Sequence, residues 1–322
     1  MADQTRELPP PSDPLGETLH LLQLHGTLYC RSELTAPWGI DLPPFEDCMM
    51  FHVITSGHCV LEVDGAEPIR LERGSLALVP HGRGHRVRSD ARADALPLFD
   101  IPVERVSERY EIMRHGGGGE RTELVCGVAR FDHVAAEHLI AQLPEVLHVD
   151  SWSQDEGGWL RSTLQFIAAE ARALKPGGET VITRLADVLV IQVLRAWIDG
   201  APSASHGWLA ALRDERLGRA LVAMHREPER DWGVESLAEF ASMSRSAFAA
   251  RFAELVGVAP MRYLTSWRLR LARRRLRDGD DPLVALADGL GYRSEAAFCR
   301  AFKREFGESP GSVRRRERAE SR

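Results

Sequence analysis

Short apolar or alternating segments fill the first part of the chain, and their spacing indicates β-strands. Alternation of apolar and polar residues is typical of a strand with one buried face, and a short apolar run is typical of a strand buried on both. Such runs occur at residues 51–57, 59–63, 68–72 and 75–80. Turn signals such as Asp64-Gly65 and Arg73-Gly74 separate them. Closely spaced strands without intervening helices predict an antiparallel β-barrel or jelly roll over residues 1–150.

The periodicity becomes helical between residues 158 and 199. Apolar side chains recur at three- and four-residue spacing on both sides of a break at Lys175–Gly178, which contains one Pro and two Gly. Two amphipathic helices joined by a tight turn form a helical hairpin, which we assign to residues 151–200. The apolar stripes have two interpretations, packing onto the barrel and dimerisation, and both can hold at once. Residues 201–207 are interpreted as a linker.

The remaining residues, 208–322, show helical periodicity, and one helix-turn-helix pattern occurs there twice. A short helix, a small or Gly-containing turn, a Ser and a second amphipathic helix follow one another in each copy. Ser244 and Ser294 are the predicted N-caps of the two second helices. Phe residues lie on one face of each second helix and are predicted to be buried. The opposite faces are predicted to be exposed and carry Ser246, Ala249, Ala250, Glu295, Ala296, Cys299, Arg300 and Lys303.

A long helix is predicted between the two patterns, from Pro260 to Arg277. It contains seven Arg and no acidic residue. Leu264, Trp267 and Leu271 form an apolar stripe along it, so we interpret it as a stiff spacer that also presents positive charge. Two reading helices on one face of straight B-form DNA would lie roughly 34 Å apart.

The net charge of −6 hides a basic domain attached to an acidic one. From residue 207 onward the chain has 23 Lys and Arg against 17 Asp and Glu, a balance of +6, whereas the rest has 18 against 30, or −12. A basic domain with two helix-turn-helix patterns predicts binding to double-stranded DNA. Arg300 is our candidate for base readout, because an exposed Arg can donate two hydrogen bonds to guanine. Arg245, Arg293 and Lys303 are the expected phosphate contacts.

Three motifs in the C-terminal part resemble the DNA-binding domain of the AraC/XylS regulators. They are the Leu-Ala-x-x-Ala-x-Met-Ser-x-Ser-x-Phe-x-x-x-Phe run from Leu237, the junction at residues 257–264, and the closing segment at residues 291–310. The resemblance spans about residues 207–318 and implies a transcription regulator. Val313 departs from the pattern, because the family usually has an aromatic residue there.

The N-terminal part resembles the cupin barrels. Gly74-x5-Pro80-x-Gly82-x2-His85 matches the second cupin signature, which ends in an inward-facing ligand His. The first signature is degraded, because its metal-ligand positions hold Pro43, Pro44, Phe45 and Met50. The region is similar to the cupin domain found at the front of one subgroup of AraC-type regulators. The resemblance therefore extends over nearly the whole chain and implies an α+β protein.

His52, His85 and Cys126 are the candidate residues inside the barrel. Strand alternation points His52 to the same side as the position of the missing cupin ligand, and the signature places His85 inside. Three interpretations are open: a divalent metal site with two nitrogen ligands and one sulfur ligand, the lining of an effector pocket, or packing alone.

The cysteine pattern and the start of the chain indicate a cytoplasmic protein. The five Cys are scattered and never form Cys-x-x-Cys, which fits a reducing compartment. Residues 1–14 are polar and Pro-rich, unlike a signal sequence, and no apolar run reaches the length of a membrane span.

The sequence thus predicts a non-enzymatic, sequence-specific transcription regulator that binds double-stranded DNA. A small-molecule effector in the cupin domain is expected to control it, and a homodimer and a contact with RNA polymerase are the other expected interactions. One alternative is a cupin-type metalloenzyme fused to a DNA-binding module, although the degraded first signature opposes it. Another is an architectural DNA-binding protein without an effector.

Overall fold

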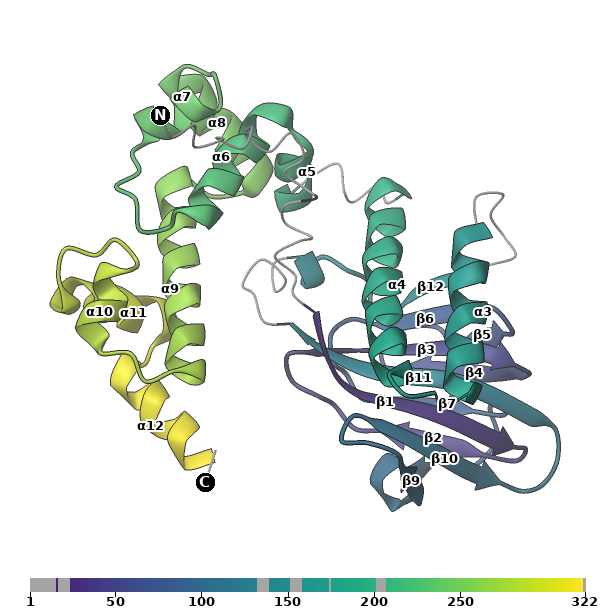
Figure 1. Cartoon of the computed structure of the whole chain (residues 1–322). Coiled ribbons are helices and arrows are strands. Elements are labelled where there is room, and N and C mark those ends of the chain that lie inside the picture. The colour runs from purple at the N-terminus through teal and green to yellow at the C-terminus, as the bar shows by residue number, and fades with distance from the viewer. Residues whose placement is uncertain are drawn as a thin grey trace, which may run out of the picture. The chain divides into compact units, whose positions relative to one another are not determined.

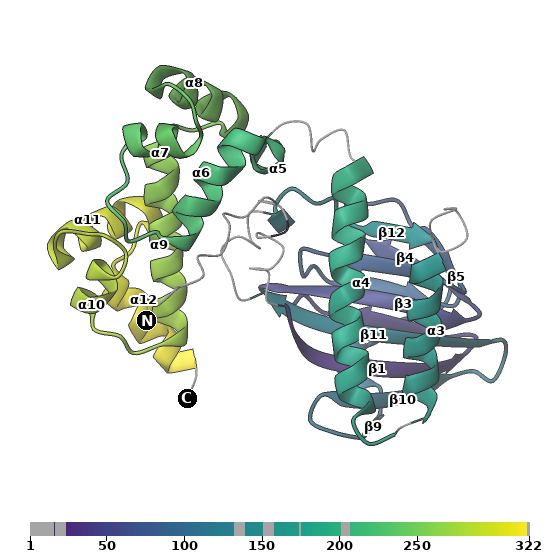
Figure 2. The ribbon, with the colours of Figure 1, turned by 45° about the horizontal axis from the view of Figure 1, so that its top comes forward.

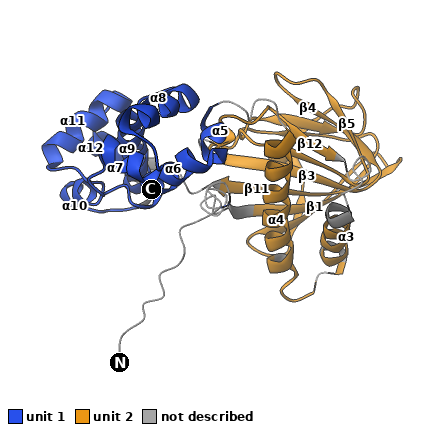
Figure 3. Ribbon diagram, turned by 90° about the horizontal axis from the view of Figure 1, so that it is seen from above, with its two compact units in different colours: residues 1–22, 133–138, 201–322 blue, residues 23–132, 139–200 orange. Residues whose placement is uncertain are grey.

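The computed structural model describes residue 16 and residues 24–131, 139–150, 158–173, 175–200 and 207–320. The chain divides into two units, with residues 23–132 and 139–200 in one and residues 201–322 in the other (Figure 3). The first unit is rich in β-sheet and the second is helical, which confirms the predicted α+β class. Of the predicted linker, residues 201–206 lie outside the described residues, and Gly207 begins a helix.

Two β-sheets form the N-terminal unit. The strands are β1 (Leu24–Thr35), β2 (Gly39–Leu42), β3 (Cys48–Ser56), β4 (His58–Val63), β5 (Ile69–Glu72), β6 (Ser75–Val79), β7 (His85–Arg88), β8 (Leu96–Pro97), β9 (Val103–Arg105), β10 (Tyr110–Gly116), β11 (Arg121–Phe131) and β12 (Leu147–Asp150). A short 3-10 helix, η1 (Leu98–Asp100), follows β8. One sheet has the strand order β12-β6-β3-β11-β1-β10-β9 and the other β5-β4-β7-β2-β8. Neighbouring strands are antiparallel, except that β1 pairs with β10 and β2 with β8 in parallel.

Apolar side chains from both sheets meet between them and form the core of this unit. The cluster includes Leu34 and Ile54 from the seven-stranded sheet and Leu61 and Val87 from the five-stranded sheet. Two sheets that share one core form the predicted jelly-roll architecture. The four runs singled out in the sequence correspond to β3, β4, β5 and β6, with small shifts at their ends.

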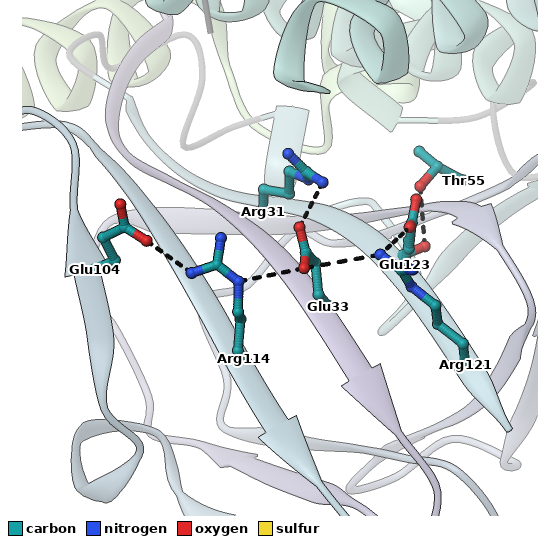
Figure 4. A network of polar contacts seen from close by, with 7 residues as sticks. All are labelled: Arg31, Glu33, Thr55, Glu104, Arg114, Arg121 and Glu123. Atoms are coloured by element: carbon teal, nitrogen blue, oxygen red, sulfur yellow. Dashed lines mark hydrogen bonds and ion pairs between the residues drawn. The ribbon is translucent and has the colours of Figure 1, made fainter. Parts of the chain in front are cut away.

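The outer face of β1, β10 and β11 carries a network of ion pairs (Figure 4). Glu33 pairs with Arg31, with Arg114 at 3.3 Å and with Arg121 at 3.7 Å, and Arg114 also pairs with Glu104 at 2.7 Å. Arg31 and Glu33 have side chains only 13% and 19% exposed. Charged residues thus occupy strand positions that would otherwise be apolar, which explains why the sequence did not single out these long strands.

Two antiparallel helices, α3 (Gly158–Ala173) and α4 (Gly178–Gly200), form the predicted hairpin. Figures 1 and 2 show both helices lying across one face of the seven-stranded sheet. Their inner sides are buried and include Leu164, Ile167, Ile182, Leu189, Val193 and Ile198. Packing onto the barrel is therefore confirmed for this side of the hairpin. Phe166 and Val188 stay 54% and 46% exposed.

Eight helices make up the described part of the C-terminal unit. They are α5 (Gly207–Arg213), α6 (Glu215–Arg226), α7 (Val234–Phe240), α8 (Arg245–Val256), α9 (Pro260–Asp278), α10 (Leu283–Asp288), α11 (Glu295–Phe306) and α12 (Pro310–Glu320). The pairs α7–α8 and α10–α11 are the two predicted helix-turn-helix motifs, and α9 is the predicted spacer. Ser244 and Ser294 cap α8 and α11, because their hydroxyls accept hydrogen bonds from the amides of Ala247 (3.3 Å) and Ala297 (3.2 Å).

Each motif packs against its own part of α9. In the first half, the ring of Phe252 from α8 lies 5.7 Å from that of Tyr263. The preceding helices α5 and α6 also pack there, because Trp208 Nε1 donates to Tyr263 (2.8 Å) and His225 stacks on Trp267 at 3.8 Å. In the second half, α9 shares a core with α10, α11 and α12 through Leu269, Ala272, Leu276, Phe298, Phe302 and Val313. Val313 is fully buried, so the smaller side chain at this position still closes the core.

Candidate nucleic-acid interface and histidine cluster

The outer face of α8 is made of small side chains. Ser246 and Ala250 are exposed and Ala249 is half-buried, whereas Phe248 and Phe252 on the opposite face are buried. Such a surface can approach a base edge closely but offers only one hydroxyl for hydrogen bonding. It fits recognition by van der Waals contact and DNA shape.

Acidic side chains already accompany the cations at this first motif. Arg245 Nε lies 3.0 Å from Glu235 Oε1 of α7. Arg251 lies 3.0 Å from Glu254 and 3.6 Å from Asp214. A phosphate that binds at Arg245 therefore competes with a carboxylate, which weakens the net gain of that contact.

The outer face of α11 is richer in charge. Arg293, Glu295, Arg300 and Lys303 are exposed, as are Ser294 and Ala296, while Cys299 is half-buried against the core of the second motif. Within the ranges that the structure describes, no acidic side chain is paired with Arg293, Arg300 or Lys303. The exposed face of the second motif thus presents three cations without an acidic partner, whereas the first motif presents small side chains.

Arg268 and Arg273 of α9 have partners inside the domain. The Arg268 guanidinium donates to the carbonyl oxygens of Pro228 and Arg230, and its half-buried position lowers its pKa. Arg273 lies 5.1 Å from the ring centre of Phe306. Part of the positive charge that the sequence assigned to α9 is therefore engaged within the domain, because these two guanidinium groups stabilise the fold.

His52, His85 and Cys126 meet inside the barrel. They come from β3, β7 and β11, and His52 is the direct cross-strand partner of Cys126. His52 Nδ1 lies 2.9 Å from Cys126 Sγ, and His52 Nε2 lies 2.7 Å from His85 Nε2. The two histidines are almost fully buried. These contacts bring together the three residues that the sequence grouped into one candidate site.

The donors and acceptors present at the cluster fix the direction of its hydrogen bonds. His85 Nδ1 lies 3.1 Å from the Arg83 carbonyl, which can only accept, so we assign the proton to Nδ1. Neutral His85 then accepts at Nε2 from His52 Nε2–H, and neutral His52 accepts at Nδ1 from the Cys126 thiol. One run of hydrogen bonds thus leads from Cys126 to Arg83, and it requires both imidazoles to be neutral.

Burial favours the neutral forms. Burial lowers the pKa of His52 well below its ordinary value, and the neighbouring His85 lowers it further. Burial also lowers the pKa of His85, although the Arg83 carbonyl and Asp41 act in the opposite direction. Burial, and then Cys30 and Cys59, raise the pKa of the Cys126 thiol. The Cys126 thiol thus stays protonated, which leaves it a weak nucleophile.

The three side chains do not fit around one metal ion. His52 faces Cys126 with one ring nitrogen and His85 with the other, so its two neighbours lie at opposite edges of the imidazole. A metal needs its ligand atoms directed at a common point, and an imidazole offers one nitrogen to it. Among the described residues, no group of three or more His, Cys, Asp or Glu is arranged to hold a metal ion.

Sequence reasoning did not identify two neighbouring thiols. Cys30 is the cross-strand partner of Cys126, and Cys59 lies in the core of the barrel. Their signal in the sequence was weak, because an isolated Cys in a strand is most often a small apolar core residue.

None of the described helices is long and apolar enough to cross a membrane.

Comparison with known proteins agrees with this arrangement. A family model described as a cupin matches residues 13–199, and one described as a helix-turn-helix domain matches residues 237–316. A Streptomyces lividans protein named as an AraC-like transcription regulator is 35% identical over 312 residues, covering 94% of this chain and 98% of that protein. The HTH-type transcriptional regulator AlkR of Acinetobacter baylyi is 30% identical over 307 residues, covering 94% of this chain and 99% of AlkR. The solved DNA-binding domain of AdpA in complex with a target DNA is 34% identical, with a TM-score of 0.31, and covers 31% of this chain and 91% of that one.

Proposed function

The chain belongs to the AraC-like transcription regulators that carry a cupin domain, and we propose that a small effector bound at the His52–His85–Cys126 cluster controls its DNA binding. One observation carries this proposal: the hydrogen-bond chain joins β3 and β11 of one sheet to β7 of the other. A ligand that inserts between these side chains changes how the two sheets are held together. It therefore acts on the barrel as a whole.

The surroundings of the cluster suggest the class of effector. The core around it is apolar and contains Met50, Ile54 and Leu124, and the two imidazoles are neutral. An apolar molecule with one hydrogen-bonding group suits these surroundings, because it replaces one of the hydrogen bonds of the cluster and buries its remaining surface in the apolar core. The effector shifts DNA binding only by as much as its affinity differs between the two arrangements of the protein. The same geometry leads us to propose an effector pocket and not a metal centre or a metalloenzyme.

At the DNA, we propose different roles for the two motifs. Arg300 reads a base in the major groove, supported by the other exposed side chains of α11, and Arg293 and Lys303 hold phosphates. Arg245 adds a weaker phosphate contact because Glu235 is beside it. Ser246, Ala249 and Ala250 give the first motif a looser sequence preference.

The exposed side of the α3–α4 hairpin is the proposed homodimer contact. Phe166 and Val188 lie on neighbouring antiparallel helices, and both are about half exposed. A second copy that covers them removes two large apolar side chains from water. We further propose that the regulator acts in the cytoplasm without catalysis of its own and contacts RNA polymerase at its target promoters.

Thermal shift on the full-length chain tests the effector proposal. A panel of small apolar molecules, each with one hydrogen-bonding group, is screened for compounds that raise the melting temperature of the wild type. His85→Gln should abolish the shift, whereas His115→Gln, a change on β10 outside the cluster, should leave it unchanged. An equal loss in both variants, or a compound that also protects His85→Gln, contradicts the proposed pocket.

Metal content is a separate check of the same site. His52→Ala and His85→Ala proteins are compared with the wild type by elemental analysis after purification without chelators. We expect no stoichiometric metal in any of the three proteins. A metal present at one equivalent in the wild type and lost in both variants would replace the effector pocket with a metal site.

A further inference from the structure

Besides their shared packing on α9, the two helix-turn-helix motifs are connected through the loop that precedes α7. The contact involves the loop between α6 and α7, residues 227–233, and the turn of the second motif at Gly291. Gly291 has a φ of +74°, and a Cβ atom there would lie only 2.4 Å from the Glu229 carbonyl oxygen. A glycine is therefore required both by the backbone conformation and by the close approach of the α6–α7 loop.

Arg268 of α9 binds the same loop and lies beside Gly291, because a Cβ atom at Gly291 would be 2.9 Å from Arg268 Nη2. Its Nη2 donates to the Arg230 carbonyl at 2.7 Å, and its Nε donates to the Pro228 carbonyl. The planar guanidinium matches two acceptors on one short segment, which a lysine ammonium cannot do with the same geometry. The backbone of residues 228–230, the Arg268 guanidinium and Gly291 thus meet at one point, which we call the Arg268 junction.

The same loop is anchored to the first motif. The Arg230 guanidinium lies 4.1 Å from the ring centre of Trp232 and 5.6 Å from that of Phe240. Phe240 is the last residue of α7, and its ring meets Trp232 edge to face at 5.3 Å. Contacts thus run without interruption from α7 of the first motif, through the loop, to the turn of the second.

From these contacts we infer that Arg268 and the 228–230 loop set the base-pair spacing that the regulator accepts between its two half-elements. Figures 1 and 2 show α7–α8 and α10–α11 at different levels of α9. A single helix fixes the distance between the motifs along its axis but resists their rotation around it only through side-chain packing. The Arg268 junction supplies a second, off-axis connection, so that both separation and rotation of α8 and α11 are defined. Arg268 is in this sense a positioning residue and not a DNA contact.

Spacing selectivity of the full-length protein tests the inference. The preferred duplex is first selected from a random pool, and the spacer between its two elements is then changed by one or two base pairs in either direction. Arg268→Ala should reduce the preference for the best spacer about tenfold, the factor equivalent to about 1.4 kcal/mol and comparable to one charge-assisted hydrogen bond. Arg268→Lys should have a smaller effect in the same direction.

Arg262→Ala is the matched control, because it removes an exposed arginine from the same helix without touching the junction. It should weaken binding to every spacer alike. Circular dichroism and melting temperature establish that each variant is folded. If Arg268→Ala does not fold, the spacer profile of Arg268→Lys is the test. An unchanged spacer profile in a folded Arg268 variant overturns the inference, as does an equal change in Arg262→Ala or selection of a single-element motif. No effector enters this experiment, so its outcome is independent of the proposed pocket.

Discussion

Acid should destabilise the cupin unit, because its two buried imidazoles must stay neutral. The pKa values of His52 and His85 are both lowered in the folded chain. The unfolded chain therefore binds more protons below about pH 6.5, so the stabilisation is complete above this pH and is lost as the pH falls through it. Between pH 7.5 and pH 5.5, each imidazole that remains neutral in the folded state lowers the free energy of unfolding by about 1.4 kcal/mol, or about 2.7 kcal/mol for the pair.

Calorimetry of the full-length protein at several pH values measures this loss. For a unit of this size, about 1.4–2.7 kcal/mol corresponds to a fall of roughly 3–10 °C in melting temperature. The double variant His52→Gln, His85→Gln should lose most of the pH dependence of the cupin transition, whereas His58→Gln, another histidine of the same unit, should keep it. A cupin transition with the same pH dependence in the wild type and the double variant would refute the assignment of neutral, buried imidazoles.

Three other predictions concern DNA reading, helix capping and assembly. Arg300→Ala should relax specificity at one base position at a cost of about 1–3 kcal/mol, whereas Lys303→Ala should weaken all sequences about equally; binding assays on specific and random duplexes separate the two. Ser294→Ala removes the N-cap of α11 and should lower the free energy of unfolding by about 1 kcal/mol in urea titrations, and an unchanged midpoint would contradict the capping role. Phe166→Glu and Val188→Glu should each shift the full-length protein toward monomer in analytical ultracentrifugation, and unaltered sedimentation would remove the hairpin as the dimer contact.

Local patterns predicted the C-terminal unit well. The Ser caps, the Phe faces and the Pro start of α9 all express short-range rules that hold wherever a helix begins or packs. The N-terminal unit was predicted less completely, and β1 shows why. This strand carries Arg31 and Glu33 on its outer face, where they pair with each other and Glu33 also pairs with cations of β10 and β11. The alternation of such a strand becomes visible only when the neighbouring strands are known.

The candidate sites, too, could be predicted from the sequence only in part. His52, His85 and Cys126 could be grouped because strand alternation and the cupin signature place them on inner faces. The arrangement that argues against a metal site could not be predicted, because it depends on which imidazole nitrogen faces which neighbour. The Arg268 junction was also hidden, since an arginine within a run of arginines gives no indication that it binds two carbonyl groups 38 and 40 residues earlier.

Counting arginines overstates the charge that α9 offers to DNA, and the salt dependence of binding can show this. If all seven arginines of α9 released counterions, they would contribute about −6 to the slope of log K against log salt. Arg268 is bound to two carbonyl groups and Arg273 lies over a Phe ring, so we expect at most about −4.5 from this helix. Arg262→Ala should flatten the measured slope by about 0.9, as expected for an exposed phosphate contact. Arg268→Ala should leave the slope unchanged while it alters spacing, and a slope that flattens equally in both variants would mean that Arg268 faces the DNA backbone after all.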